Sequence, residues 1–97
     1  MMQDHKIIER MITRKAQPKA DELGIEFKVK FSVKEGMNNF LVRIKRNIPN
    51  SLEGLSEEEI QGYKRIAEKQ SQFVDHIAKI IVPDYSYDVR FTYPSRL

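Results

Sequence analysis

Residues 25–34 alternate strictly between apolar and polar side chains. Successive side chains of a β-strand point to opposite faces of the sheet, so this alternation predicts a strand with one buried and one open face. The apolar positions are Ile25, Phe27, Val29, Phe31 and Val33. The open face of the same strand carries Glu26, Lys28, Lys30, Ser32 and Lys34.

The alternation returns twice. Residues 35–39 contain Gly36 and two asparagines, which tolerate the backbone of a tight reversal, and residues 40–45 then resume the pattern. These features predict an antiparallel hairpin. A third strand is expected over residues 85–93, where the apolar face is mostly aromatic and Pro94 ends the pattern.

A short first helix is predicted over residues 4–15, where apolar residues recur at the spacing of one helical stripe. The stripe consists of Ile7, Ile8, Met11 and Ile12. Pro18 lacks a backbone N–H and disfavours helical geometry at the residue before it, so the helix is expected to stop or kink there. A second turn-like piece is expected near Asp21, and Gly24 ends the region.

The second helix has the clearest start in the chain. Ser56 and Glu59 form the pattern of a capping box, and the acidic residues 57–59 suit the positive end of the helix dipole. A long apolar stripe follows until Pro83. Its members are Ile60, Tyr63, Ile66, Ala67, Phe73, Val74, Ile77, Ala78, Ile80 and Ile81.

These elements predict an α+β fold in the order α-β-β-α-β. The long helix can return the chain across the sheet, so the third strand is expected beside the first, in a three-stranded antiparallel sheet of order 2-1-3. The second helix should pack on one face and leave the other open. A chain of 97 residues is expected to be a single domain, 1–97, with flexible ends near 1–4 and 94–97.

The composition removes several classes of chemistry. With no cysteine there is no disulfide, thiolate metal site or thiol nucleophile. His5 and His76 lie in unrelated segments, and the consecutive Glu57, Glu58 and Glu59 are explained by capping. No metal, cofactor or enzymatic centre is therefore expected. No apolar run is long enough to cross a membrane, and the charged first ten residues do not read as a signal peptide, so a cytoplasmic protein is expected.

Positive charge is concentrated in the first half of the chain. Residues 1–50 hold 11 Lys/Arg against 6 Asp/Glu, whereas residues 51–97 hold 6 against 8. The predicted hairpin gathers several of these cations on its open face, and the first helix adds Lys6, Arg10 and Arg14. The hairpin set is Lys28, Lys30, Lys34, Arg43, Lys45 and Arg46. We interpret it as a candidate nucleic-acid-binding surface of a non-enzymatic domain that contacts the phosphate backbone.

Two alternatives remain open at this stage. Outward lysines also protect the edges of sheets from aggregation. Leu41, Met37 and the short apolar stripe of the first helix suit a protein-interaction or inhibitor module, including a homodimer, with no nucleic-acid role. Base stacking on Tyr85, Tyr87 and Tyr93 is disfavoured, because they share a face with Val89 and Phe91.

Overall fold

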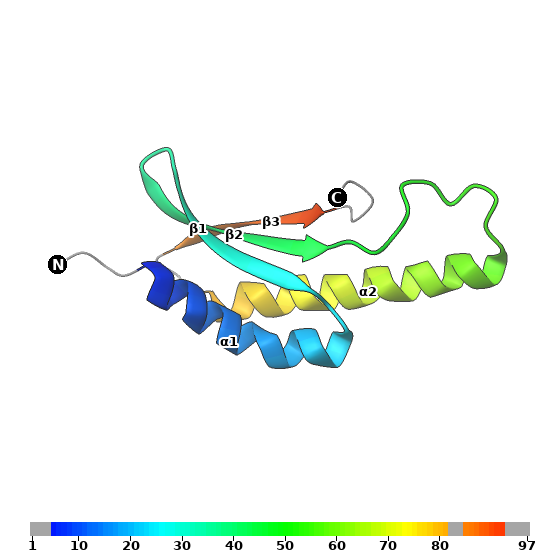
Figure 1. The fold of residues 1–97 in the computed structure, drawn as a ribbon, viewed down its shortest axis with the longest axis horizontal. Helices are drawn as coiled ribbons and strands as arrows, with labels where there is room; N and C mark the ends of the chain where they lie inside the picture. Colours follow the sequence, from blue (N-terminus) through cyan, green and yellow to red (C-terminus); the bar gives the residue numbers. More distant parts are fainter. Residues whose placement is uncertain (1–4, 82–84, 93–97) are drawn as a thin grey trace.

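The structure is a computed structural model that describes residues 5–81 and 85–92, without the side chains of residues 33, 34, 37 and 38. The ends expected to be flexible, 1–4 and 94–97, lie outside the described residues. Two helices and a three-stranded mixed sheet form an α+β fold, with both helices on one side of the sheet (Figure 1). In chain order the elements are α1 (His5–Leu23), β1 (Phe27–Lys34), β2 (Met37–Lys45), α2 (Glu57–Ile80) and β3 (Ser86–Thr92).

The sheet order is β1-β2-β3, and the predicted order 2-1-3 is wrong. β3 pairs with β2 and runs parallel to it, so the sheet is mixed and not purely antiparallel. The physical reason lies in α2, which carries the chain back to the end of the sheet where β2 began. A strand that follows such a helical crossover beside its predecessor must run parallel to it.

β2 is accordingly the central strand and carries the most deeply buried residues of the sheet. Phe40, Val42 and Ile44 have no exposed surface. On the helix side Val42 and Ile44 belong to one buried cluster with Phe73 and Ile77 of α2, which are also fully buried. The core therefore lies between the middle of the sheet and the second half of α2.

The hairpin between β1 and β2 is confirmed, with Phe31 paired to Phe40 and Phe27 paired to Ile44. The reversal is tighter than the segment 35–39 predicted. It consists of Glu35 and Gly36, which both adopt positive φ angles of 52° and 77°. Two successive residues with positive φ are the signature of a hairpin turn whose twist matches that of the strands.

The helix α1 does not stop at Pro18, and the prediction that it would is wrong. Its buried residues, Ile12, Ala16 and Ala20, lie on both sides of the proline and pack as one stripe. Pro18 itself is exposed, so the carbonyl oxygen that loses its hydrogen-bond donor lies on the water side of the helix. Packing of the small alanines against the core outweighs this loss.

The expected apolar stripe of the first helix is only partly buried. Ile12 is buried, but Ile7 and Met11 are 52% and 49% exposed. The helix ends where Gly24 takes a φ of 68°, with the Gly24 and Ile25 N–H groups donating to the carbonyl oxygens of Asp21 and Ala20. This pair of hydrogen bonds is a Schellman motif, and it turns the chain directly into β1.

The start of α2 is confirmed in detail. Ser56 is the N-cap, its hydroxyl accepts from the Glu59 N–H at 3.1 Å, and the Glu59 carboxylate accepts from the Ser56 N–H at 3.2 Å. The first half of the helix extends past the strands (Figure 1), and the molecule measures 56 Å along its longest axis. Ile60, Tyr63 and Ile66 of the predicted stripe are therefore only half-buried.

Replacing Ser56 by alanine is expected to lower the free energy of unfolding by about 1 kcal/mol. The Glu59 N–H loses its acceptor, and the reciprocal hydrogen bond from the residue 56 N–H to the Glu59 carboxylate is no longer held in place. The melting temperature should fall by roughly 4–8 °C in a domain of this size. Thermal unfolding followed by circular dichroism measures this. Ser71, which is exposed inside the same helix, provides the control: Ser71→Ala should leave the melting temperature unchanged or raise it slightly.

Candidate nucleic-acid interface

One face of the sheet is not covered by a helix in the described part of the chain, and we call it the uncovered face. It is formed by the side chains that alternate with the core residues along the three strands. Most of them are exposed and hydrophilic. Its described members are Lys28, Lys30, Ser32, Asn39, Leu41, Arg43, Lys45, Ser86, Asp88, Arg90 and Thr92.

The register of the strands aligns three cations in one row across the whole sheet. Lys28 of β1 is paired with Arg43 of β2, and Arg43 is paired with Arg90 of β3. We call these three residues the basic row. All three side chains are exposed, and the ion pairs Lys19–Glu22 and Lys45–Glu26 involve none of them. Neighbouring strands lie about 4.8 Å apart, so the row spans about 10 Å of backbone.

The adjoining row joins Lys30, Leu41 and Asp88. Lys30 is exposed and extends the positive charge along β1, whereas the Asp88 carboxylate accepts a hydrogen bond from Asn39 Nδ2 at 3.2 Å. Asp88 thus supplies a negative charge on the β3 side of this row. Positive charge on the uncovered face is strongest on β1 and at the end of the sheet where the basic row lies.

A buried polar residue fixes the other end of the face. Asn39 is only 4% exposed, and its side chain donates to Asp88 and accepts from the Ser86 hydroxyl at 2.8 Å. Buried amide groups need such partners, since an unpaired one costs about 1–3 kcal/mol. The two hydrogen bonds tie β2 to β3 and hold the uncovered face in one arrangement.

Three of the sequence-predicted site residues join neither the basic row nor Lys30 beside it. Lys45 lies on the uncovered face, but its ammonium group is 3.4 Å from the Glu26 carboxylate. Arg46 follows β2 and places its guanidinium over the Phe91 ring on the helix side, at 5.9 Å from the ring centroid. Lys34 pairs through its backbone with Met37 at the hairpin tip, and its side chain lies outside the described atoms. Lys28, Lys30 and Arg43 are thus the predicted residues that the structure brings together.

Sequence reasoning missed Arg90. The alternation of residues 85–93 places Arg90 on the polar face of the third strand, but the predicted order puts β1 between that strand and Arg43. The parallel pairing with β2 aligns Arg90 with Arg43. The lysines of β1 are typical of an edge strand. An order with β1 at the edge and β2 in the centre would have placed Arg90 beside Arg43.

The remaining candidates of the sequence have structural roles. Tyr85 packs its ring on Phe40 at 5.3 Å, and Tyr87 is half-buried beside the core, while Tyr93 lies outside the described residues. The His5 ring stacks on Phe31 at 3.6 Å. His76 faces α1, with its Nε2 atom 3.5 Å from the Lys15 carbonyl oxygen. Across residues 5–81 and 85–92, no group of three or more histidine or acidic side chains is arranged to hold a metal ion.

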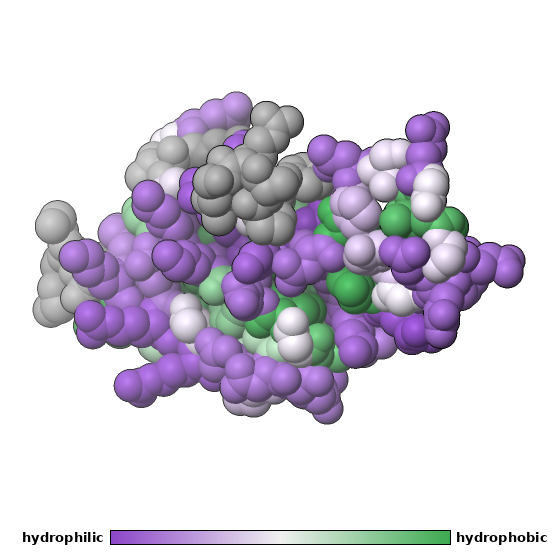
Figure 2. All heavy atoms as spheres, turned by 45° about the vertical axis from the view of Figure 1, so that its right-hand side comes forward, coloured by the Kyte–Doolittle hydropathy of each residue, from purple (hydrophilic) through white to green (hydrophobic). Residues whose placement is uncertain are grey.

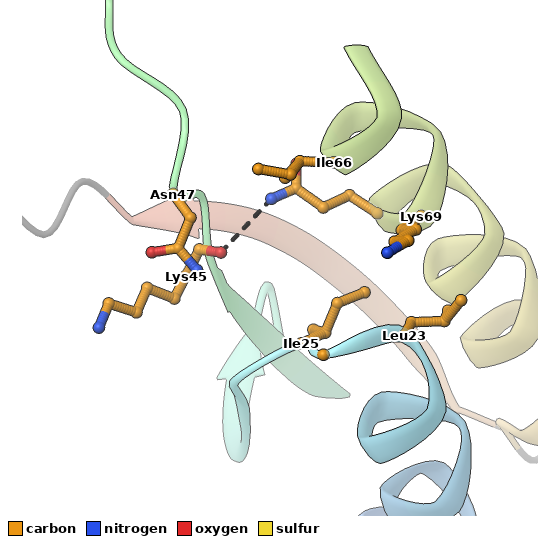
Figure 3. Close-up of a pocket in the computed structure, with 8 residues that line it drawn as sticks. Leu23, Ile25, Lys45, Asn47, Ile66 and Lys69 are labelled. Atoms are coloured by element: carbon orange, nitrogen blue, oxygen red, sulfur yellow. Dashed lines mark hydrogen bonds between the residues drawn. The ribbon is translucent and has the colours of Figure 1, made fainter. Parts of the chain in front are cut away.

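A cavity of about 220 Å³ lies where α2 leaves the sheet, between the end of α1 and the end of β2 (Figure 3). Leu23, Ile25 and Ile66 supply apolar walls, and Gln70 donates from its side chain to the Lys45 carbonyl oxygen at 3.5 Å. Its lining contains no carboxylate, hydroxyl or imidazole group. Its ionisable side chains are the two lysines Lys45 and Lys69, and the uncovered face, where more cations gather, remains the candidate site.

Comparison with protein-family models, with curated protein sequences and with solved structures found no match to this chain. Within the described residues, neither helix has an apolar stretch of the length needed to span a membrane. The assignment of a function therefore depends on the geometry of the uncovered face.

Proposed function

We propose that this chain is a non-enzymatic binding domain whose uncovered face holds the phosphate backbone of a nucleic acid without reading its sequence. The observation that supports this is the basic row, in which Lys28, Arg43 and Arg90 lie side by side across all three strands. Phosphates would neutralise this row, and Lys30 beside it adds a fourth cation.

The basic row is energetically unfavourable for the protein alone. Like charges on adjacent strands destabilise a sheet by roughly 0.2–1 kcal/mol for each pair. Arg43 has such a neighbour on both sides. A polyanion would remove the repulsion and gain two or more charge-assisted hydrogen bonds, because guanidinium groups bind phosphate oxygens in a bidentate manner.

The chemistry of the face favours backbone contacts over base readout. Its described members include no aromatic side chain, so bases have no ring on which to stack. A face three strands wide is broader than the recognition helix or two-stranded ribbon that a DNA groove admits. The proposed binding is therefore tolerant of sequence and driven by the release of counterions.

The test is a fluorescence-anisotropy titration of the purified protein against a labelled mixed-sequence single strand and a labelled duplex at several salt concentrations. If four cations contact phosphates, the logarithm of the affinity for the single strand should fall with the logarithm of salt at a slope of about −3. This corresponds to a loss of about 50-fold between roughly 50 and 200 mM salt. Lack of binding at low salt, or binding that salt does not weaken, would contradict the proposal.

A protein-interaction module without a nucleic-acid role is the second candidate. Ile7 and Met11 favour it, because these large apolar side chains are about half exposed one turn apart on α1. Against it, the surface seen in Figure 2 is mostly hydrophilic, with apolar residues in separate small patches. A partner bound through α1 would be released by Met11→Asp and would depend little on salt.

A further inference from the structure

The outer edge of β3 has no partner strand among residues 5–81 and 85–92. The Arg46 N–H donates to the Thr92 carbonyl oxygen at 2.9 Å, so the backbone of Thr92 faces β2. N–H and C=O groups of a strand point alternately to its two sides, and those of Tyr87, Val89 and Phe91 therefore point away from β2. Among the described residues no strand lies on that side, because β3 ends the sheet.

The opposite edge of the sheet is partly covered. On β1 the outward N–H of Phe31 donates to the Glu9 carboxylate of α1 at 2.5 Å. Exposed edge strands are ready templates for another strand, and proteins usually cover or charge them. β3 has the open edge of this sheet, and its central residues carry one negative and one positive charge, Asp88 and Arg90.

The sequence of β3 is complementary to itself when two copies run antiparallel about Val89. In this register Ser86 lies opposite the partner's Thr92, Tyr87 opposite the partner's Phe91, and Asp88 opposite the partner's Arg90. The outward backbone groups of Tyr87, Val89 and Phe91 then form the hydrogen-bonded pairs. Asp88 and Arg90 fall at the non-hydrogen-bonded positions, where opposite side chains approach most closely.

The same charges disfavour the neighbouring registers. A slip that centres the pair on residue 88 places Asp88 opposite the partner's Asp88, and a slip to residue 90 places Arg90 opposite the partner's Arg90. Both create like-charge pairs at the centre of the interface, whereas the register centred on Val89 creates two opposite-charge pairs. Charge therefore selects one antiparallel pairing.

The flank of α2 beside β3 is shaped for close approach. Small side chains follow one another on this side of the helix, and three of them line a hollow shared with Phe91. They are Ala67, Ser71, Val74 and Ala78. Ala67, Ser71 and Ala78 are exposed. Helices pack at about 8–10 Å, which is the width of two strand spacings, so two copies of α2 can lie side by side beneath a β3 pair.

From these observations we propose that two copies of this chain associate through their β3 edges into a two-fold dimer with a continuous six-stranded sheet. A strand pair alone buries less than the roughly 1,200 Å² of a stable interface, and the apposed α2 flanks supply the additional area. The two-fold symmetry makes every contact reciprocal. This inference is tested without any ligand, and it shares Arg90 with the proposed nucleic-acid-binding surface.

The decisive experiment uses two opposite charge reversals, Asp88→Arg and Arg90→Asp, and sedimentation velocity. The wild-type protein should be a dimer. Each variant alone should weaken dimerisation by roughly tenfold or more, because both central pairs become like-charged. An equimolar mixture should recover the dimer, since the first variant offers two arginines to the two aspartates of the second.

The mixture also controls for misfolding, because a damaged variant would not recover its partner. A wild-type protein that sediments as a monomer at high micromolar concentration would overturn the proposal. Variants that stay dimeric alone, or a mixture that fails to associate, would overturn it equally.

A second test uses proline, which lacks the N–H that the partner strand would bind. Val29 and Val89 lie in the same row on either side of Val42, on opposite edges, and both direct their N–H groups outward. Edge positions of this kind tolerate proline. Val89→Pro should give a folded monomer and Val29→Pro a dimer; a folded, dimeric Val89→Pro variant would exclude the β3 edge as the interface.

Discussion

Phe73→Ala is expected to lower the free energy of unfolding by about 3–5 kcal/mol. Phe73 has no exposed surface, and its ring packs on Phe27 at 5.1 Å. Truncation removes an aromatic ring from the region where α2 meets the sheet and leaves a cavity. Domains of this size are usually stable by 5–15 kcal/mol, so the variant should be close to unfolding at physiological temperature.

Urea denaturation followed by circular dichroism measures this loss. Phe91→Ala provides a control with the same chemical change, because Phe91 is 37% exposed at the edge of the sheet. It should cost less than half as much. Equal losses for the two variants would show that the core is not centred on α2 and β2 as described.

Arg43→Glu should weaken nucleic-acid binding and at the same time stabilise the fold. The substitution places a carboxylate between Lys28 and Arg90, so two repulsive neighbours become attractive ones. The melting temperature is expected to rise by roughly 5 °C. Affinity for a single strand should fall by at least about tenfold, since the central phosphate contact becomes a repulsion.

The opposite directions of the two effects separate loss of binding from damage to the fold. Anisotropy titration and thermal unfolding of the same sample measure both. Lys64→Glu, an identical change of charge on the exposed part of α2, should leave the affinity nearly unchanged. If Lys64→Glu and Arg43→Glu weakened binding equally, net charge and not the basic row would be responsible.

The local elements of the fold were predictable because their signals are local. Alternation in β1, the turn at Gly36 and the capping box at Ser56 each act within a few residues, and the structure confirms all of them. The course of α1 through Pro18 was not predictable in this way. It depends on Ala16 and Ala20 packing against the core, and two alanines carry almost no periodic signal.

Strand order failed for a different reason. Placing β3 beside β1 or beside β2 leaves its direction and its buried face unchanged, so hydrophobic pattern cannot distinguish the two arrangements. The same ambiguity affects which residues belong to the candidate site. Lys28, Lys30 and Arg43 depend only on the hairpin and were found, whereas Arg90 depends on the crossover and was missed.

The parallel pairing of β3 also has a consequence for the order of folding. Asn39 and Ser86, which are joined by a hydrogen bond, lie 47 residues apart in the chain, whereas β1 and β2 are joined by a two-residue turn. Closing a long segment lowers the chain entropy before the stabilising contacts form. We therefore expect α1 and the hairpin to form first and β3 to dock last. Until that step the edge of β2 is open. A second molecule could donate its β3 to this edge, so the same late step would allow domain swapping at high protein concentration.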